Sequence, residues 1–233
     1  NKNLVVVNIS GNAVAMPWIA EVPAVLQAWF LGSEAGNAIA SVLVGDANPS
    51  GKLPFTFPAK LEDVPAHSLG EYSGVNSRQV VDLKYNEGIF VGYRWADKQK
   101  KVKPLFPFGH GLSYTTFAYG KSSADQKTIS ADGTLTVKVT VKNTGTREGQ
   151  EVVQLYISDK ESSLPRPIKE LKGFKKVKLA PGEEKEVSFT INADALSFFD
   201  DARHAWVAEP GKFEAIIAAS ATDIKGVVPF ELQ

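Results

Sequence analysis

The stretch LTVKVTVK, residues 135–142, alternates apolar and polar side chains at every position. A period of two is typical of a β-strand that buries one face and exposes the other to water. The same alternation returns at residues 153–157, 187–191 and 213–217, and Gly, Pro and Asn residues separate the runs. Several short strands joined by such turns predict a β-sandwich from about residue 117 to the end.

The first half of the chain has a different pattern, in which short apolar runs alternate with helical segments. Residues 4–9, LVVVNI, predict a strand covered on both faces, and residues 24–30 form a second apolar run. Apolar residues at helical spacing between positions 35 and 43 predict an amphipathic helix, with Ser33 as its N-cap and Gly45 at its end. This order is typical of an α/β domain. Two strands are too few for a stable core, so the pattern is expected to begin in the middle of a sheet.

Between these two parts the sequence predicts a long loop, residues 46–84, in which Pro54, Pro58 and Pro65 discourage regular elements. A loop of this length usually wraps another domain or shapes a site. We therefore divide the chain into an α/β part with the loop (1–84), a linker (85–116) and the β-sandwich (117–233). The basic stretch at residues 98–103 is short and reads as a solvated hairpin tip or loop.

Composition excludes several classes of function. The 233 residues include 26 Lys and Arg and 26 Asp and Glu, so no global field favours nucleic acid or an anionic membrane. There are no cysteines, which removes disulfides, thiolate zinc sites and cysteine nucleophiles. A sandwich without an inter-sheet disulfide is expected to be fibronectin-like rather than antibody-like. No apolar run approaches the roughly 20 residues of a membrane span.

The search for catalytic residues gives few candidates. His67, His110 and His204 are the only histidines, and none stands at a recognisable spacing from a nucleophile. No metal, phosphate-binding or dinucleotide motif is present. The sequence therefore predicts no metal site and no cofactor.

Acidic residues are further candidates, because paired carboxylates about 5–5.5 Å apart carry out retaining glycoside hydrolysis. Glu71 and Glu87 lie in or beside the long loop and could face a sugar. In the simpler interpretation, Glu87 pairs with Arg94 or Lys84 to fix a turn. Turn residues are also the simplest interpretation of three aspartates, namely Asp46, Asp200 and Asp201.

Three tryptophans, Trp18, Trp29 and Trp95, could stack on pyranose rings. Each stands among apolar residues, so packing in a core is the favoured interpretation.

Several ordered segments together resemble glycoside hydrolase family 3. In the first half they are WFLGSEAGNAIA (29–40), GDANPSGKLPFTFP (45–58), YNEGIFVGYR (85–94) and PFGHGLSYTTF (107–117). In the sandwich they are EVVQLY (151–156), RPIKELKGF (166–174) and PGE (181–183). The resemblance covers nearly the whole chain. It implies a (β/α) barrel, an α/β sandwich domain and a fibronectin type III-like domain, of which this chain holds the end of the second and all of the third.

The resemblance also implies the chemistry. The family's nucleophilic Asp and acid/base Glu are expected upstream of Asn1, so no residue here is assigned a catalytic role. The chain, which opens without Met, is expected to be cut or processed upstream. The expected function is that of the C-terminal part of a retaining, exo-acting β-glucosidase, with this chain mainly a scaffold. Partners implied are a β-linked glucoside and the missing N-terminal part, with neither nucleic acid nor membrane, in a periplasmic or secreted protein.

Alternatives remain open at this stage. The parent could be a β-xylosidase of the same family. The chain could instead be a non-catalytic carbohydrate-binding or interaction module. An N-acetylglucosaminidase parent is a weaker option, because such members commonly lack the fibronectin-like domain.

Overall fold

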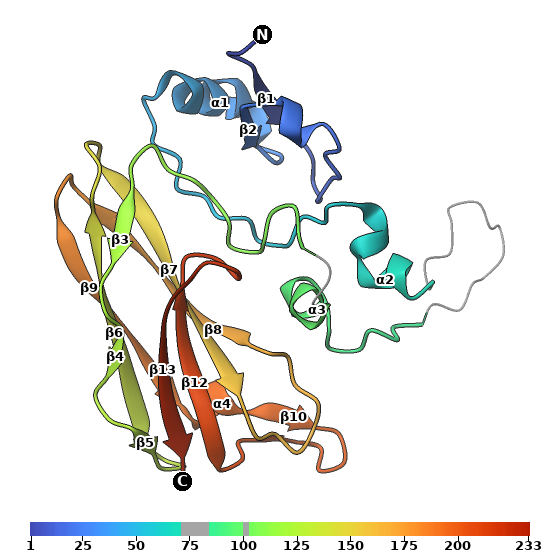
Figure 1. Cartoon of the computed structure of the whole chain (residues 1–233), viewed down its shortest axis with the longest axis vertical. Helices are drawn as coiled ribbons and strands as arrows, with labels where there is room; N and C mark the ends of the chain where they lie inside the picture. The colour runs from blue at the N-terminus through green and yellow to red at the C-terminus, as the bar shows by residue number, and fades with distance from the viewer. Residues whose placement is uncertain (71–83, 100–102) are drawn as a thin grey trace. The chain divides into compact units, whose positions relative to one another are not determined.

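The computed structural model describes residues 1–70, 84–99 and 103–233 (Figure 1). The chain forms two compact units. The first comprises Asn1–Asn48 and Leu53–Phe108, and the second comprises Pro49–Lys52 and Gly109–Gln233. The first unit is α/β and the second is a β-sandwich, which confirms the predicted fold class.

In the first unit, two short strands pair in parallel. β1 (Val5–Asn8) lies beside β2 (Ala24–Gln27), with Asn8 opposite Gln27, and the 3-10 turn η1 (Ile19–Glu21) lies between them in the chain. The prediction that the first strand is covered on both faces is wrong for this chain. Val5 is 45% exposed and Ile9 57% exposed, because a single strand pair is an open layer that only neighbouring elements can cover.

Helix α1 (Ala35–Val44) follows a 3-10 turn, η2 (Gly32–Glu34). Gly45 ends the helix in the left-handed conformation with φ 85°, as predicted. Ser33 is not the N-cap, because η2 already contains it and Glu34 occupies the cap position. None of the residues of α1 is buried within this chain, so its apolar face is only partly covered.

The predicted loop contains short helices. They are η3 (Leu61–Asp63) and α2 (Pro65–Ser68), and α3 (Tyr93–Lys98) follows residues 71–83, which lie outside the described part. Pro65 was expected to discourage regular structure, but it begins α2, where a proline's missing N–H group costs no hydrogen bond. Lys98 ends α3, and the rest of the basic stretch is described only at Gln99 and Lys103.

The second unit consists of two antiparallel-rich sheets drawn in green to red in Figure 1. One sheet has five strands in the order β5-β13-β12-β7-β8. In the other, β9 pairs along residues 134–142 of β6, while β3 pairs with residues 141–143 and β4 with residues 137–138 of the same strand. The strand bounds are β3 Phe117–Tyr119, β4 Ser123–Ala124, β5 Thr128–Ile129, β6 Thr134–Asn143, β7 Gly149–Asp159, β8 Glu170–Leu179, β9 Glu184–Asn192, β12 Gly211–Ala218 and β13 Ile224–Leu232.

The core of the sandwich follows the period-two pattern. Every second residue of β6 from Leu135 to Val141 is at most 1% exposed, as the alternation predicts. The predicted inward positions of β7, β9 and β12 are likewise buried, at no more than 5% exposure. These side chains form one cluster: Leu135, Val137, Val139, Val141, Val153, Leu155, Ile157, Val187, Phe189, Ile191, Phe213, Ala215 and Ile217, with neighbours from β5, β13 and α4.

A small hairpin stands beside this core. The helical turn α4 (Ala193–Leu196) is capped by Asn192, whose Oδ1 accepts from the Ala195 N–H at 3.1 Å. Strands β10 (Phe198–Asp200) and β11 (Ala205–Val207) follow and pair antiparallel. The Asp200 carboxylate accepts from the backbone N–H groups of Ala202 and Arg203, which confirms Asp200 as a turn residue.

Residues 49–52 belong to the sandwich unit, although they lie far from it in sequence. The Lys52 ammonium donates to the Gly111 carbonyl at 2.9 Å and lies 3.1 Å from the Glu151 carboxylate. A Cβ atom on Gly111 would lie 2.1 Å from the Gly51 carbonyl oxygen, so this close approach requires glycine. The segment is therefore fixed to the sandwich by both charge and backbone packing.

Candidate functional site

The carboxyl ends of β1 and β2 carry a cluster of neutral polar side chains. The Asn8 amide donates to Gln27 Oε1 at 2.6 Å and to Ser10 Oγ at 3.1 Å. The Gln27 amide in turn donates to Ser10 Oγ at 3.2 Å. In open α/β sheets, ligands bind outside the carboxyl ends of parallel strands. This edge is therefore the candidate functional site of the first unit, and its groups suit an uncharged, hydroxyl-rich ligand.

Trp29 lies two residues past the end of β2 and has a positive φ of 57°. A bulky residue in this region is strained, and such strain persists only where neighbouring packing fixes it. The Trp29 ring makes edge contacts with Phe55, at 5.2 Å between centroids, and Phe57, at 6.0 Å. The indole is thus held in place by an aromatic cluster, and it is only half-buried.

The other two candidate tryptophans differ from Trp29. Trp95 is 6% exposed and its Nε1–H donates to the Asp63 carbonyl at 3.0 Å, which confirms the packing interpretation. Trp18 is half-buried, and its carbonyl accepts from the Glu21 N–H at 2.9 Å at the start of η1.

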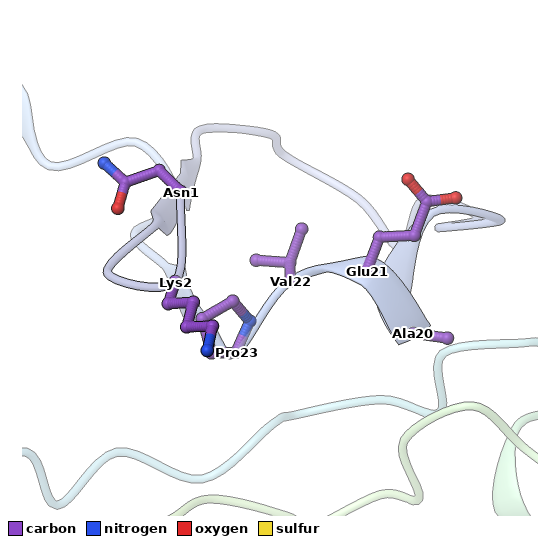
Figure 2. A pocket seen from close by; sticks show the side chains of 6 residues that line it. All are labelled: Asn1, Lys2, Ala20, Glu21, Val22 and Pro23. Atoms are coloured by element: carbon purple, nitrogen blue, oxygen red, sulfur yellow. The ribbon is translucent and has the colours of Figure 1, made fainter.

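A surface depression lies at the opposite, amino ends of the same strands (Figure 2). Its lining residues are Asn1, Lys2, Ala20, Glu21, Val22 and Pro23. Figure 2 shows the Glu21 carboxylate pointing away from the Lys2 amine, so the two charges do not converge on one point. Small-molecule sites are concave, largely apolar and carry a few convergent polar groups. The depression lacks that convergence and lies at the wrong end of the strands, so we do not assign it as a site.

The acidic candidates do not form a visible pair. Glu87 is half-buried in a turn, where its carbonyl accepts from the Phe90 N–H at 3.1 Å. Glu71 lies outside the described residues. Asp46 is exposed directly after α1, and Asp201 is exposed in the turn between β10 and β11. The pairing of Glu87 with Lys84 or Arg94 stays a prediction.

In the sandwich, the most buried carboxylates are neutralised by cations. Arg166, whose side chain is 6% exposed, contacts Asp159 at 2.9 Å and also pairs with Glu170. Glu151 pairs with Lys52 and accepts from the Tyr119 hydroxyl at 3.2 Å. Burial, reinforced by the charge of Glu151, raises the pKa of Tyr119 far above its ordinary value. These groups are structural, because each carboxylate is engaged in an ion pair within the fold.

Two carboxyl groups at the surface of the sandwich unit have lowered pKa values. Backbone and side-chain hydrogen bonds, from Ala180 and Lys185, lower the pKa of Glu183. The Ser163 hydroxyl and N–H lower the pKa of Glu209 in the same way. A general acid needs the opposite shift, so neither group is suited to protonate a leaving oxygen.

The three histidines belong to different parts of the fold. His67 is in α2, and exposed His204 has a φ of 50° in the turn between β10 and β11. His110 is half-buried in the sandwich unit, and burial, with the nearby Lys52 charge, lowers its pKa. Across residues 1–70, 84–99 and 103–233, no three His, Cys, Asp or Glu side chains cluster as metal ligands would. No helix in those ranges is long and apolar enough to span a bilayer.

Two features of the sandwich unit were not found from sequence. One is the Lys52–Glu151 pair, whose members are 99 residues apart. The other is an exposed pair of aromatic rings, Phe199 and Trp206, on facing positions of β10 and β11. The alternation of inward and outward residues along each short strand could have indicated that the two rings are exposed. Nothing in the sequence indicated that the two strands pair with each other.

Two protein-family descriptions match the chain. Residues 1–93 match the glycosyl hydrolase family 3 C-terminal domain, and residues 151–221 match the fibronectin type III-like domain.

Related proteins agree with this family assignment. A β-glucosidase of Bacteroides ovatus is 59% identical over 99% of this chain and 30% of its own length. The thermostable β-glucosidase B of Acetivibrio thermocellus is 48% identical over 95% of this chain and 28% of its own length. The chain thus spans about 30% of the length of these relatives.

Solved structures match the fold as well. The β-glucosidase of Kluyveromyces marxianus in complex with glucose superposes with a TM-score of 0.89 and 42% identity, over 100% of this chain and 27% of its own. β-Glucosidase 3B of Thermotoga neapolitana, also in complex with glucose, superposes with a TM-score of 0.86 and 38% identity. The match covers 97% of this chain and 31% of that protein. The chain therefore belongs to glycoside hydrolase family 3, as that family's C-terminal domain followed by a fibronectin type III-like domain.

Proposed function

We propose that this chain is the C-terminal part of a retaining, exo-acting β-glucosidase that removes terminal non-reducing β-D-glucosyl residues. The observation that carries the proposal is the 59% identity, over 99% of the chain, to a protein named a β-glucosidase. Because the chain spans 30% of that relative, the activity is proposed for the whole protein. The role proposed for this chain is mainly that of a scaffold.

The ionisable groups support a scaffold role. Retaining hydrolysis needs one carboxylate as nucleophile and one carboxyl group with a raised pKa as acid. The carboxylates Glu151, Asp159 and Glu170 are instead engaged in ion pairs with Lys52 and Arg166. We therefore expect the nucleophilic Asp and the acid/base Glu in the part of the enzyme that precedes Asn1.

Exposed apolar side chains support the upstream part of the enzyme as partner. Leu4 is 43% exposed on the approach to β1, and Val44 is 71% exposed at the end of α1. Apolar side chains in a strand and on a helix face are normally covered by neighbouring elements. We infer that upstream segments of the same enzyme cover them.

Other aspects of the function stay predictions. With balanced charge, we expect neither nucleic acid nor a membrane surface as a partner. A periplasmic or secreted location rests on family resemblance alone. The polar edge at Asn8, Ser10 and Gln27 is proposed to face the substrate-binding side of the enzyme, since its neutral amides and hydroxyl match sugar hydroxyls.

The experiment compares the full-length protein with the 233-residue chain alone, using 4-nitrophenyl β-D-glucoside. We expect turnover by the full-length protein, with the β-anomer of glucose released first, and none by the chain alone. Clear turnover by the chain would contradict the absence of the catalytic pair. The matching xyloside tests the β-xylosidase alternative, which would require faster cleavage of xyloside than of glucoside.

A further inference from the structure

Phe199 and Trp206 form an exposed aromatic pair on the sandwich. They lie directly opposite each other on β10 and β11, with ring centroids 5.8 Å apart and planes at 70°. Trp206 is 71% exposed and Phe199 is 46% exposed. Single exposed apolar residues are ordinary, but two large exposed rings in contact on one small hairpin indicate a candidate binding surface.

The hairpin that carries these rings is firmly held. Phe198, the neighbour of Phe199 on the inward side, lies 5.3 Å from the guanidinium of Arg166. That guanidinium also donates to the Leu196 carbonyl at 2.8 Å, just before β10. In the turn, Asp200 accepts two backbone N–H groups and pairs with Arg203 at 3.1 Å. The rings are thus presented by a fixed frame, which lowers the entropy lost on binding.

Charge near the rings favours a neutral ligand. Arg203 is paired with Asp200, and the Glu209 carboxylate accepts both the N–H and the hydroxyl of Ser163. Binding a charged partner would require these contacts to be exchanged. A neutral sugar needs apolar faces to stack on, and the two exposed rings supply them.

The area of the patch excludes a second copy of this chain as the occupant. Two aromatic side chains bury at most about 300–500 Å² together, whereas a stable protein interface needs roughly 800 Å² on each partner. The patch instead matches one or two pyranose rings, whose axial C–H faces pack on aromatic rings.

We propose that Phe199 and Trp206 form a binding platform for uncharged β-linked oligosaccharides. The choice of a β-glucan as the ligand rests on the proposed function. The sugar face stacks on the exposed indole of Trp206, and Phe199 fixes the orientation of that indole through the edge contact.

The test uses the full-length protein in native gels that contain hydroxyethyl cellulose, with the retardation giving an affinity. Trp206→Ala should weaken binding by about tenfold, and Phe199→Ala by less. Trp206→Phe should restore part of the binding because it keeps an aromatic face. The matched control is Phe174→Ala, which removes an equally exposed ring on β8 (66% exposed) and should bind like wild type.

Two further measurements keep the outcome clear. Thermal unfolding of each variant should match wild type, because the substituted rings are exposed, and hydrolysis of 4-nitrophenyl β-D-glucoside is measured on wild type. If hydroxyethyl cellulose retards wild type but wild type does not hydrolyse the glucoside, the proposed function is contradicted and the platform is not. The platform is overturned if wild type is not retarded, if Trp206→Ala is retarded as strongly as wild type, or if Trp206→Ala changes the sedimentation coefficient, which indicates a protein contact.

Discussion

The two units of this chain bury their apolar side chains very differently. In the sandwich, one contiguous cluster that includes Leu135 and Ile217 is essentially inaccessible to water. In the described part of the first unit, the buried apolar side chains are Met16, Ala28, Phe57 and Trp95, and none belongs to α1. Burial of apolar area is the main source of folding free energy. The sandwich therefore has an extensive apolar core of its own, whereas the described part of the first unit buries few apolar side chains.

The largest effect is expected from removing the buried cation of the sandwich. Arg166→Met leaves Asp159 and Glu170 as buried carboxylates without their counter-charge. The free energy of unfolding should fall by about 3–5 kcal/mol. Urea denaturation followed by circular dichroism measures this. Lys138→Met is the control, because it removes only the exposed partner of Glu186 and should cost about 0–1 kcal/mol; an equal loss for both would refute the distinction.

A leucine-to-alanine pair compares the two units directly. Leu135→Ala removes a fully buried side chain of β6 and should cost the chain about 3 kcal/mol. Leu43→Ala in α1, where the side chain is 46% exposed, should cost less than about 1 kcal/mol in the chain alone. In the full-length enzyme the cost at Leu43 should rise if upstream segments cover it. An unchanged cost at Leu43 in both proteins would show that α1 stays uncovered.

Hydrogen exchange sharpens the comparison without any substitution. Amides of β1, β2 and α1 should exchange through local opening, well before those of β6 and β7, which require unfolding of the sandwich. Mass spectrometry of the 233-residue chain resolves the segments. Similar protection in both units would mean that the first unit is closed by itself, against the exposure of Val5 and Ile9.

The smallest expected effect is a pH dependence at His110. Burial and then the Lys52 charge lower its pKa below 6.5, with Asp223 acting in the opposite direction. Below pH 6.5 the unfolded chain binds more protons at this residue than the folded chain does. Stability should therefore be lost as pH falls from 6.5 through the lowered pKa. Denaturation on both sides of pH 6.5 checks this, and a slope that survives His110→Gln unchanged would assign it to other groups.

Sequence patterns predicted the sandwich better than the first unit, for a physical reason. In β6, each side chain points either into the core or outward, and the period-two alternation of apolar and polar residues predicts which. The end of α1 at Gly45 was equally predictable, because the left-handed conformation that ends a helix favours glycine. The burial of β1 could not be predicted from its sequence, because burial depends on which other elements pack against the strand. The role of Pro65 depended on whether a helix begins or continues there.

The candidate sites were less predictable. Trp95 could be assigned to packing, but nothing local in the sequence distinguishes it from Trp29, whose backbone is strained. No sequence pattern singles out Trp206, because its exposure follows from the pairing of two three-residue strands. Long-range contacts such as Lys52–Glu151 are set by tertiary structure, which no local pattern encodes.

The four residues 49–52 have a practical consequence for dividing this chain into its two units. The chain leaves the first unit after Asn48, returns at Leu53 and leaves again after Phe108, so a single cut cannot separate the units cleanly. A recombinant domain beginning at Gly109 would lack Lys52 and leave Glu151, at 5% exposure, without its cation. Grafting this sandwich onto another enzyme would require transplanting two separate pieces of sequence.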